Sequence, residues 1–222
     1  LLKAIIARGM MPASEGYVAD LLWPDADGDM AMNSLATTLH RLRKLMGRPD
    51  AIIVKNAQIS LDPRLCWVDS WAFEQVFSKA ESQWGSAGTE RAKGRLCELA
   101  CASLEMYRGE FLPDEVWNPD AFTMREHLRG RYFQGLYRLG EHLARNARWE
   151  QALHLYEQGL NVDDCAEGCY QGVMRCLERM GRRSEALAVF ERCRRTLDLR
   201  LGAVPSSQTQ ALSRSIRQGT EH

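Results

Sequence analysis

The amino-acid sequence predicts a mainly α-helical protein with one small β-hairpin, and three observations predict this fold class. Apolar residues recur at helical spacing through residues 29–46, and two short β-prone runs follow within residues 51–61. Residues 139–191 then contain an internal repeat with an offset of 34 residues. We therefore expect a three-helix module with a hairpin, followed by a domain of stacked helix pairs.

The composition is that of an ordinary globular protein. The chain has 222 residues, of which 45% are hydrophobic and 26% are charged, so it is long enough for two domains with their own cores. No apolar run approaches the roughly 18 residues that a membrane-spanning helix needs, and no signal peptide is recognisable. These features exclude a membrane protein. Because Leu1 lies inside an apolar helical stretch, we expect further sequence upstream of this chain.

The residue types that usually carry chemistry do not form a recognisable site. Seven cysteines, an odd number, lack the dense spacing of a disulfide scaffold, which favours a reducing cytoplasm. Cys97 and Cys101, like Cys165 and Cys169, are four residues apart, but no Cys-x-x-Cys pair or histidine cluster supports a metal site. The chain also has no phosphate-binding glycine loop, nucleophile elbow or convincing carboxylate pair. The sequence therefore predicts no enzyme, no cofactor and no metal.

Charge is balanced over the whole chain but not along it. The 29 basic and 29 acidic residues give a net charge of zero, so bulk electrostatics does not indicate a nucleic-acid partner. Between residues 33 and 64, however, six Lys or Arg residues outnumber two Asp residues. This local excess suits a DNA-binding face, and it is equally compatible with a solvated surface.

The first two helices are short and have clear ends. An apolar stripe predicts a helix over residues 1–8 that stops near Gly9. Ser14 is placed to cap a second helix that runs to Trp23, and Pro24 ends it.

The third helix is amphipathic. Asp29 is a plausible N-cap and Gly47 a plausible stop. At 100° per residue, an apolar stripe forms on one face from Leu35, Leu39, Leu42 and Met46. The opposite face carries Asn33, Thr37, His40, Arg41 and Lys44.

A hairpin follows this helix at once. Residues 51–54 and 58–61 form its strands around residues 55–57. A polar-faced helix followed by a hairpin is the pattern of a winged helix-turn-helix, whose second helix lies in the major groove of DNA. The hairpin is then the wing.

We expect the polar face of the third helix to contact base edges. Arg41 is the leading candidate, because its guanidinium can bind guanine through two hydrogen bonds. The alternative for the small hydroxyl side chains is that they only face solvent. The candidates for base contact are Asn33, Ser34, Thr37, Thr38 and Arg41.

Basic side chains at the end of the helix and on the hairpin are candidates for phosphate contacts, which position a protein without reading the base sequence. For Lys55 the alternative role is to keep an edge strand soluble. The candidates for phosphate contact are His40, Arg43, Lys44 and Lys55.

The remainder of the chain reads as helical. A helix begins within residues 67–77, where Trp67, Trp71 and Phe73 are expected to be buried, and residues 79–94, rich in Ser, Gly and charge, read as a linker. Two helices follow at 96–107 and 117–138.

The internal repeat has the period of a tetratricopeptide, a helix–turn–helix unit of 34 residues. Residues 148–157 align with residues 182–191, with Ala152 matching Ala186 and Tyr156 matching Phe190. We expect the small Ala to let paired helices approach, and the aromatic ring to fill the groove of the next layer.

Both halves of the chain resemble one bacterial family. Residues 39–47 look like the end of the recognition helix of an OmpR-type winged helix. The later part resembles the tetratricopeptide-like bacterial transcriptional activation domain, as found in regulators of the antibiotic-regulatory-protein type and in large ATP-dependent activators. The stretches that carry this second resemblance are Leu104–Leu112, Arg125–Arg129, Gly181–Phe190 and Leu201–Thr209.

Two features depart from the family pattern. An OmpR-type domain opens with a small sheet before its first helix, and because this sequence begins inside the expected first helix, we expect that sheet to be missing from it. The wing has Ala57 where the family has glycine. If the turn needs positive φ at both central residues, Ala57 lowers stability, or the tip adopts another turn.

The resemblance implies a cytoplasmic transcriptional regulator, expected to be an activator, with a definite set of partners. These are double-stranded promoter DNA, RNA polymerase, a second copy bound beside it on DNA repeats, and an upstream sensory or ATPase domain. Asp25 and Asp27, before the third helix, are candidates for polymerase contact; their alternative role, shared with Asp29, is helix capping.

We place the winged helix-turn-helix DNA-binding domain at residues 1–78, the linker at 79–94 and the activation domain at 95–217. The helical repeats would serve oligomerisation and polymerase or intramolecular contacts. The alternative function is a protein-interaction scaffold whose winged helix no longer binds DNA. The clustering of Thr, Arg and Lys on one helix face argues against it, because a disused face need not keep them.

Overall fold

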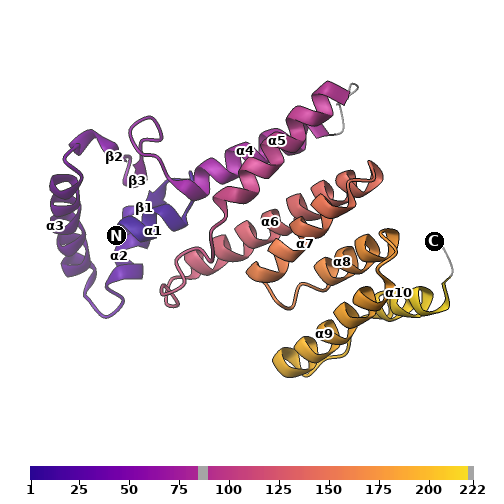
Figure 1. The fold of residues 1–222 in the computed structure, drawn as a ribbon. Coiled ribbons are helices and arrows are strands. Elements are labelled where there is room, and N and C mark those ends of the chain that lie inside the picture. Colours follow the sequence, from indigo (N-terminus) through magenta and orange to yellow (C-terminus); the bar gives the residue numbers. More distant parts are fainter. Residues whose placement is uncertain (85–89, 220–222) are drawn as a thin grey trace. The chain divides into compact units, whose positions relative to one another are not determined.

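The computed structural model describes residues 1–84 and 90–219, and the chain divides into two compact units. Unit 1 comprises residues 1–86 and 105–131, and unit 2 comprises residues 87–104 and 132–222. The fold is mostly helical with one small sheet, as predicted (Figure 1).

Unit 1 begins with three helices and a hairpin in the predicted order. The Oγ atom of Ser14 accepts a hydrogen bond from the N–H of Tyr17 at 3.2 Å, which confirms the predicted cap of the second helix. The elements are α1 (Leu2–Ala7), β1 (Ala13–Ser14), α2 (Glu15–Leu22), α3 (Gly28–Met46), a short 3-10 turn (Pro49–Ala51), β2 (Ile52–Lys55) and β3 (Gln58–Leu61).

For α3 the predicted C-terminal end is correct and the predicted N-cap is not. Gly47 stops the helix in the left-handed conformation with φ of 66°. The N-cap is Asp27, and the prediction of Asp29 was wrong. The carbonyl of Asp27 already accepts the N–H of Ala31 at 2.8 Å, so helical bonding starts two residues earlier and leaves Asp29 in the first turn.

The sheet contains a strand that the sequence analysis missed. Strand β1 pairs antiparallel with β3, with Ala13 opposite Ile59, so the strand order is β1-β3-β2. Two residues are too few to show an alternating pattern, which is why β1 is invisible in the sequence.

The tip of the hairpin is a turn with positive φ at both central residues, Asn56 at 53° and Ala57 at 55°. This is the geometry of a type I′ turn, which matches the twist of the two strands. Ala57 therefore sits where its Cβ is unfavourable. Its carbonyl accepts the N–H of Glu15 at 2.9 Å, which ties the tip to the start of α2.

A buried aspartate fixes the chain just after the hairpin. The carboxylate of Asp62 accepts hydrogen bonds from the backbone N–H of Arg64 at 2.9 Å and from its Nη2 at 2.7 Å. The Arg64 side chain, and then its backbone N–H, hold the pKa of Asp62 at about 2, below the ordinary value of 3.8. A carboxylate with a lowered pKa stabilises the fold above its unfolded pKa, and this contribution disappears as pH falls through the folded pKa.

We expect Asp62→Asn to flatten the acid limb of the stability profile. The wild-type chain should lose the Asp62 contribution between about pH 4 and pH 2, and the variant has no such contribution to lose. Urea unfolding at several pH values between 5 and 2 measures this difference. If the free energies of unfolding of the two proteins fall in parallel over this interval, Asp62 does not couple folding to protonation.

The core of unit 1 lies between the three helices and the sheet. Its centre is formed by side chains from α1, α2, α3 and the strands, which explains why the predicted apolar stripe of α3 faces inward. The buried members include Ile5, Val18, Leu35, Leu39, Ile59 and Leu61.

A loop that carries part of the family resemblance packs within unit 1. Lys3 pairs with Glu115 at 2.6 Å, and Asp120 accepts hydrogen bonds from Arg8 at 3.1 Å and from the Tyr17 hydroxyl at 2.7 Å. Residues 105–131 therefore join the winged helix, although the predicted activation domain begins at residue 95.

Arg125 connects two of the stretches on which the resemblance was based. Its Nε donates to the carbonyl of Phe111 at 2.9 Å, and its Nη2 donates to the carbonyl of Leu112 at 2.6 Å. Leu112 has φ of 45°. The arginine thus satisfies backbone carbonyls in a loop that cannot satisfy them within a helix.

The helices α4 (Asp69–Trp84) and α5 (Glu90–Met106) extend into the predicted linker at 79–94 from both sides. In α4 the buried side chains of Phe73, Phe77 and Ala80 continue one stripe, so the helix does not stop at residue 78. Residues 85–89 lie outside the described part of the chain.

The prediction that the aromatic residues after the hairpin are buried is correct for two of the three. Trp71 and Phe73 are buried, but 76% of Trp67 is exposed. Trp67 lies two residues before α4 begins at Asp69, so it is not part of the apolar side of that helix.

Unit 2 is a stack of helices, and over residues 149–218 each helix packs against the next one in sequence. It contains most of α5 and the end of α6 (Pro119–Arg145), followed by α7 (Trp149–Val162), α8 (Glu167–Arg179), α9 (Arg183–Leu201) and α10 (Ser207–Gln218). Figure 1 shows α7 to α10 following one another in orange and yellow.

The internal repeat is visible in the backbone. Ala147 after α6 and Gly181 after α8 both have positive φ, 55° and 77°. The residue after each donates to a carbonyl five residues back, Arg148 to Leu143 and Arg182 to Leu177. Each turn ends one helix and starts the next in the same way, so the 34-residue period reflects a repeated helix–turn–helix.

The side chains of the repeat also behave as expected. Ala152 and Ala186 have no exposed surface, so close approach of the helices depends on their size. The ring of Tyr156 lies against Gly140 of α6 and Gly172 of α8, where it fills the groove between layers.

The segment around residues 201–209 closes the stack. Gly202, with φ of 61°, ends α9, and Ser206 caps α10. The carboxylate of Glu167 in α8 accepts hydrogen bonds from the Ser206 N–H at 2.8 Å and from the hydroxyl of Thr209. These bonds attach α10 to α8, which gives the end of the Leu201–Thr209 stretch a structural role.

Candidate nucleic-acid interface

Helix α3 presents a polar face that its core contacts hold outward. Ala31, Leu35 and Leu39 are buried along one side. The predicted polar side chains on the other side are exposed, namely Asn33, Thr37, His40, Arg41 and Lys44. The structure therefore brings these candidates for base and phosphate contact onto one accessible surface.

Three of the candidates for base contact share one line on this face. Asn33, Thr37 and Arg41 are four residues apart, so they follow one another at successive turns of the helix. Such a line places an amide, a hydroxyl and a guanidinium side by side, and each can hydrogen-bond to base edges in a major groove.

Ser34 and Thr38 lie at the edge of the face and are half-buried. The hydroxyl of Thr38 donates to the carbonyl of Ser34 at 2.7 Å, and the hydroxyl of Thr37 donates to that of Asn33 at 2.9 Å. Both threonine hydroxyls use their proton within the helix, so toward a base they can act only as acceptors.

Arg43 has a different position from the other basic residues. It is half-buried, and its Nη2 donates to the carbonyl of Ile52 at 3.2 Å. This bond links α3 to the first residue of β2 and so fixes the wing against the helix. The sequence analysis could not find this role, because it depends on a backbone carbonyl nine residues away.

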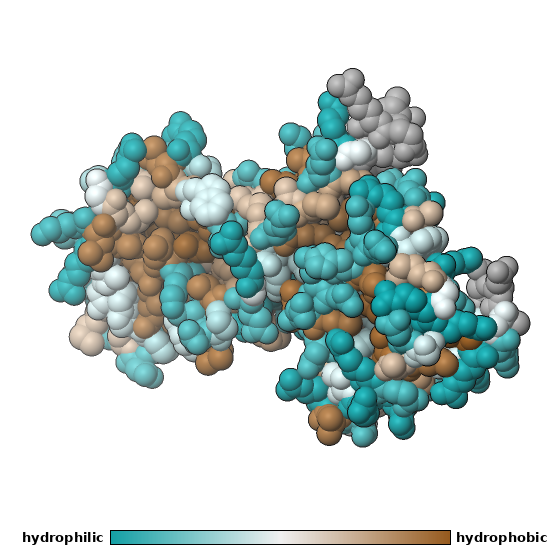
Figure 2. All heavy atoms as spheres, in the orientation of Figure 1, coloured by the Kyte–Doolittle hydropathy of each residue, from teal (hydrophilic) through white to brown (hydrophobic). Residues whose placement is uncertain are grey.

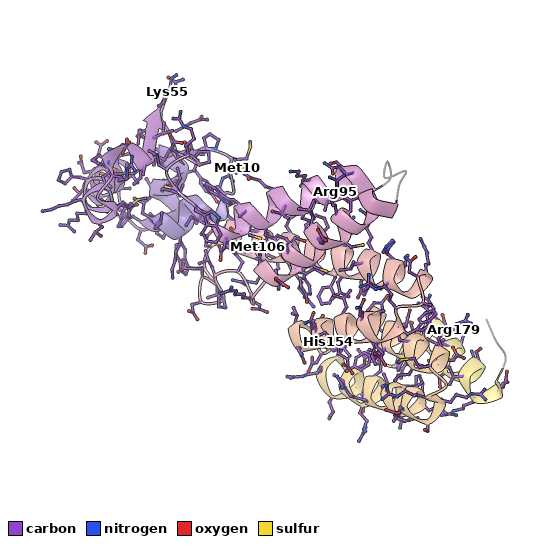
Figure 3. All side chains as sticks on the ribbon, turned by 45° about the horizontal axis from the view of Figure 1, so that its top comes forward. Met10, Lys55, Arg95, Met106, His154 and Arg179 are labelled. Carbon is purple, nitrogen blue, oxygen red and sulfur yellow. The ribbon has the colours of Figure 1, made fainter. Side chains whose placement is uncertain are left out.

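The wing carries Lys55 at its tip. Lys55 is exposed, and Figure 3 shows it projecting from the end of the hairpin, away from the body of unit 1. Strand β2 is an edge strand whose Ile53 and Val54 are partly exposed, 39% and 37%. Both the phosphate-contact role and the role of protecting an edge strand are compatible with this position.

Apolar side chains also lie around the polar face, which the sequence analysis did not single out. In the space-filling view, the apolar surface of unit 1 gathers between α3 and the N-terminal helices (Figure 2). The exposed apolar residues of α3 are Met30, Met32 and Leu45. Such side chains can contact thymine methyl groups or sugars, so they extend the candidate surface.

The acidic loop before α3 is accessible. Asp25 and Asp27 are exposed, and the side chain of Asp27 makes no cap hydrogen bond although it occupies the N-cap position. Capping by a side-chain hydrogen bond is therefore not its role. Asp29 lies in the first turn, where its negative charge interacts favourably with the positive end of the helix dipole.

One acidic cluster in unit 2 has the ligand types of a metal site. Asp163, Asp164 and Cys165 place their ligand atoms within 4.8 Å of one another. Asp164 forms an ion pair with Arg200 at 3.1 Å, and Asp163 accepts the N–H of Cys165 at 2.9 Å. These carboxylates therefore have protein partners, and a structural role explains them.

Among the helices of the described residues, none combines the length and the apolar character that crossing a bilayer requires.

Comparison with known proteins identifies the family of this chain and two similar proteins. A family model described as bacterial transcriptional activator domain matches residues 68–217. Regulatory protein AfsR of Streptomyces coelicolor is 28% identical over 250 residues, covering 98% of this chain and 22% of that protein. Regulatory protein AfsR of Streptomyces griseus is 26% identical over 245 residues, covering 100% and 22%. The chain thus spans about a fifth of the length of these relatives.

A solved structure supports the fold. Mycobacterium tuberculosis EmbR, in complex with a low-affinity phosphopeptide, matches with a TM-score of 0.76 at 18% sequence identity. The match covers 100% of this chain and 59% of that one. The arrangement of helices and sheet described above is therefore an arrangement that also occurs in EmbR.

Proposed function

Because the chain belongs to the bacterial transcriptional activator domain family, we propose that it regulates transcription by reading promoter DNA with α3 and the wing. The observation that carries this proposal is the exposed line of Asn33, Thr37 and Arg41 on a helix whose other side is buried. A helix held in this way can enter a major groove with its polar residues facing base edges.

The roles of the individual residues follow from their positions. Asn33, Thr37 and Arg41 contact bases, with Ser34 and Thr38 at the edge of the contact. His40, Lys44 and Lys55 contact phosphates, and Arg43 positions the wing while any free N–H of its guanidinium adds a phosphate contact. Enzymatic catalysis has no part in this function.

We propose RNA polymerase and a second copy of the chain as partners. Asp25 and Asp27 are exposed at the start of α3 and offer carboxylates to a basic surface on the polymerase. Copies bound side by side on repeated DNA sites would place these loops in a row. The seven cysteines lack the dense spacing of a disulfide scaffold, which fits a reducing cytoplasm.

The proposal is tested first by the salt dependence of DNA binding. We expect the whole chain to bind a fluorescently labelled duplex, with log K falling linearly in log salt concentration. Lys44→Ala should reduce the magnitude of that slope by about 1, because one phosphate contact is lost. Fluorescence anisotropy between about 50 and 200 mM salt measures both.

Lys79→Ala is the matched control, since Lys79 is an exposed lysine of α4 in the same unit but outside the α3 surface. It should leave the slope at the wild-type value. Absence of binding at the lowest salt concentration, or equal losses in both variants, would contradict a DNA-binding role for α3.

A further inference from the structure

Unit 2 contains a cavity that the proposed DNA-binding function does not use. Its volume is about 560 Å³, within the range of ligand pockets, and it lies between α6, α7, α8 and α10. Both helical repeats and the helix after them therefore contribute to it. The lining residues that matter for its chemistry are Trp149, Tyr156, Arg175, Cys176, Arg179 and Leu212.

One wall of the cavity is aromatic. The ring of Tyr156 occupies the space that a Cβ would need at Gly172, where its ring carbons lie 2.5 Å from the position of that Cβ. Trp149 and Leu212 extend this apolar wall. The Tyr156 hydroxyl has no hydrogen-bond partner among the described residues, and burial raises its pKa, so it remains a neutral donor.

The lining of the cavity also carries a positive charge, the guanidinium of Arg175. Among the residues that the structure describes, no carboxylate lies within ion-pair distance of Arg175, whereas Arg145 on the same cavity pairs with Glu141 at 3.2 Å. Arg179 lies one helical turn beyond Arg175 on α8, and Figure 3 labels it. Burial raises the pKa of the Cys176 thiol to about 11, so it is not a nucleophile at neutral pH.

The geometry points to an acidic peptide segment of another protein as the occupant, with a carboxylate side chain on Arg175 and a neighbouring apolar side chain against Tyr156 and Trp149. Three arginines outnumber Glu141 and Glu178 in the lining, so the cavity favours a net negative ligand. The site does not depend on DNA reading by α3.

An extended chain fits better than a compact ion or a nucleic acid. Glu141 and Arg145 on α6, like Arg175 and Arg179 on α8, are four residues apart, so charged groups recur about 6 Å apart along two walls. The carboxylates of Glu141 and Glu178 would repel a continuous row of phosphates. Alternating acidic and apolar side chains avoid this repulsion.

The experiment is selection of peptides from a random heptapeptide pool displayed on phage, with the whole chain as target. We expect enrichment of peptides that carry Asp or Glu next to an aromatic or aliphatic residue. Synthetic copies of the enriched peptides should bind Arg175→Glu at least tenfold more weakly than the wild type. Replacing their acidic residues by Asn or Gln should have a similar effect.

Two further variants complete the test. Ala211→Trp places a large side chain in the cavity without changing its charge, and it should also abolish binding. Arg214→Glu changes an exposed arginine of α10 outside the lining, and it should bind like the wild type. Circular dichroism confirms that each variant is folded. Failure to enrich any acidic–apolar motif, equal loss in Arg214→Glu, or displacement of the peptide by duplex DNA would overturn the proposal.

Discussion

Replacing Gly172 by alanine is expected to destabilise unit 2 by about 1–3 kcal/mol, the usual effect of overpacking a well-filled interior. The new Cβ would lie 2.5 Å from carbons of the Tyr156 ring, which no side chain tolerates, and the ring has Gly140 on its other side. Neither a rotation of the ring nor a shift of α8 relieves the clash without disturbing the neighbouring layer. Urea unfolding followed by circular dichroism measures the loss.

Two further variants separate this clash from the ordinary effect of alanine in a helix. Gly130→Ala, on α6 with open space around the new Cβ, should stabilise the chain by about 0.5–1 kcal/mol. In a chain that already carries Tyr156→Ala, Gly172→Ala should no longer destabilise, because the ring is absent. Additive effects of Gly172→Ala and Tyr156→Ala would contradict the packing described for the repeats.

Leu35→Ala is expected to lower the stability of unit 1 by about 2–5 kcal/mol, because it truncates a fully buried side chain at the centre of α3. Thr37→Ala, two residues later on the exposed face, should change stability by no more than about 0.5 kcal/mol. The two substitutions lie on opposite sides of one helix.

For DNA affinity the order of the two variants should be reversed, with the larger effect in Thr37→Ala. Under conditions where both variants are folded, Leu35→Ala should bind a specific duplex like the wild type, whereas Thr37→Ala should bind about fivefold more weakly, the value of one hydrogen bond of about 1 kcal/mol. Chemical unfolding and fluorescence anisotropy give the two quantities. A stable Thr37→Ala variant with unchanged DNA affinity would remove Thr37 from the interface.

Long amphipathic helices and the internal repeat could be predicted from the sequence because each leaves a strong periodic signal. The spacing of Leu35 and Leu39 is enough to identify the inner side of α3, and the matched Ala152 and Ala186 are enough to identify the repeat. The hairpin was predictable because both of its strands are β-prone and a short turn separates them, although the first strand runs over Ile52–Lys55, one residue later than predicted.

Features that depend on contacts distant in sequence could not be predicted. Strand β1 consists of two residues and exists only because β3 is available to pair with it. From the sequence alone Arg43 is predicted to be a surface cation, because its hydrogen bond to the carbonyl of Ile52 depends on the tertiary structure. The joining of residues 105–131 to unit 1 depends on pairs such as Lys3 with Glu115, which are 112 residues apart.

Selection of bound duplexes from a random-sequence pool, with wild type and Arg41→Ala in parallel, tests most directly whether α3 reads bases. We expect the wild type to enrich a motif and Arg41→Ala to select the same motif with one position relaxed, because a guanidinium bound to guanine contributes about 1–3 kcal/mol of discrimination. Arg95→Ala, an exposed arginine of α5, should select the wild-type motif unchanged. No motif from the wild type, or an identical motif from Arg41→Ala, would contradict the account.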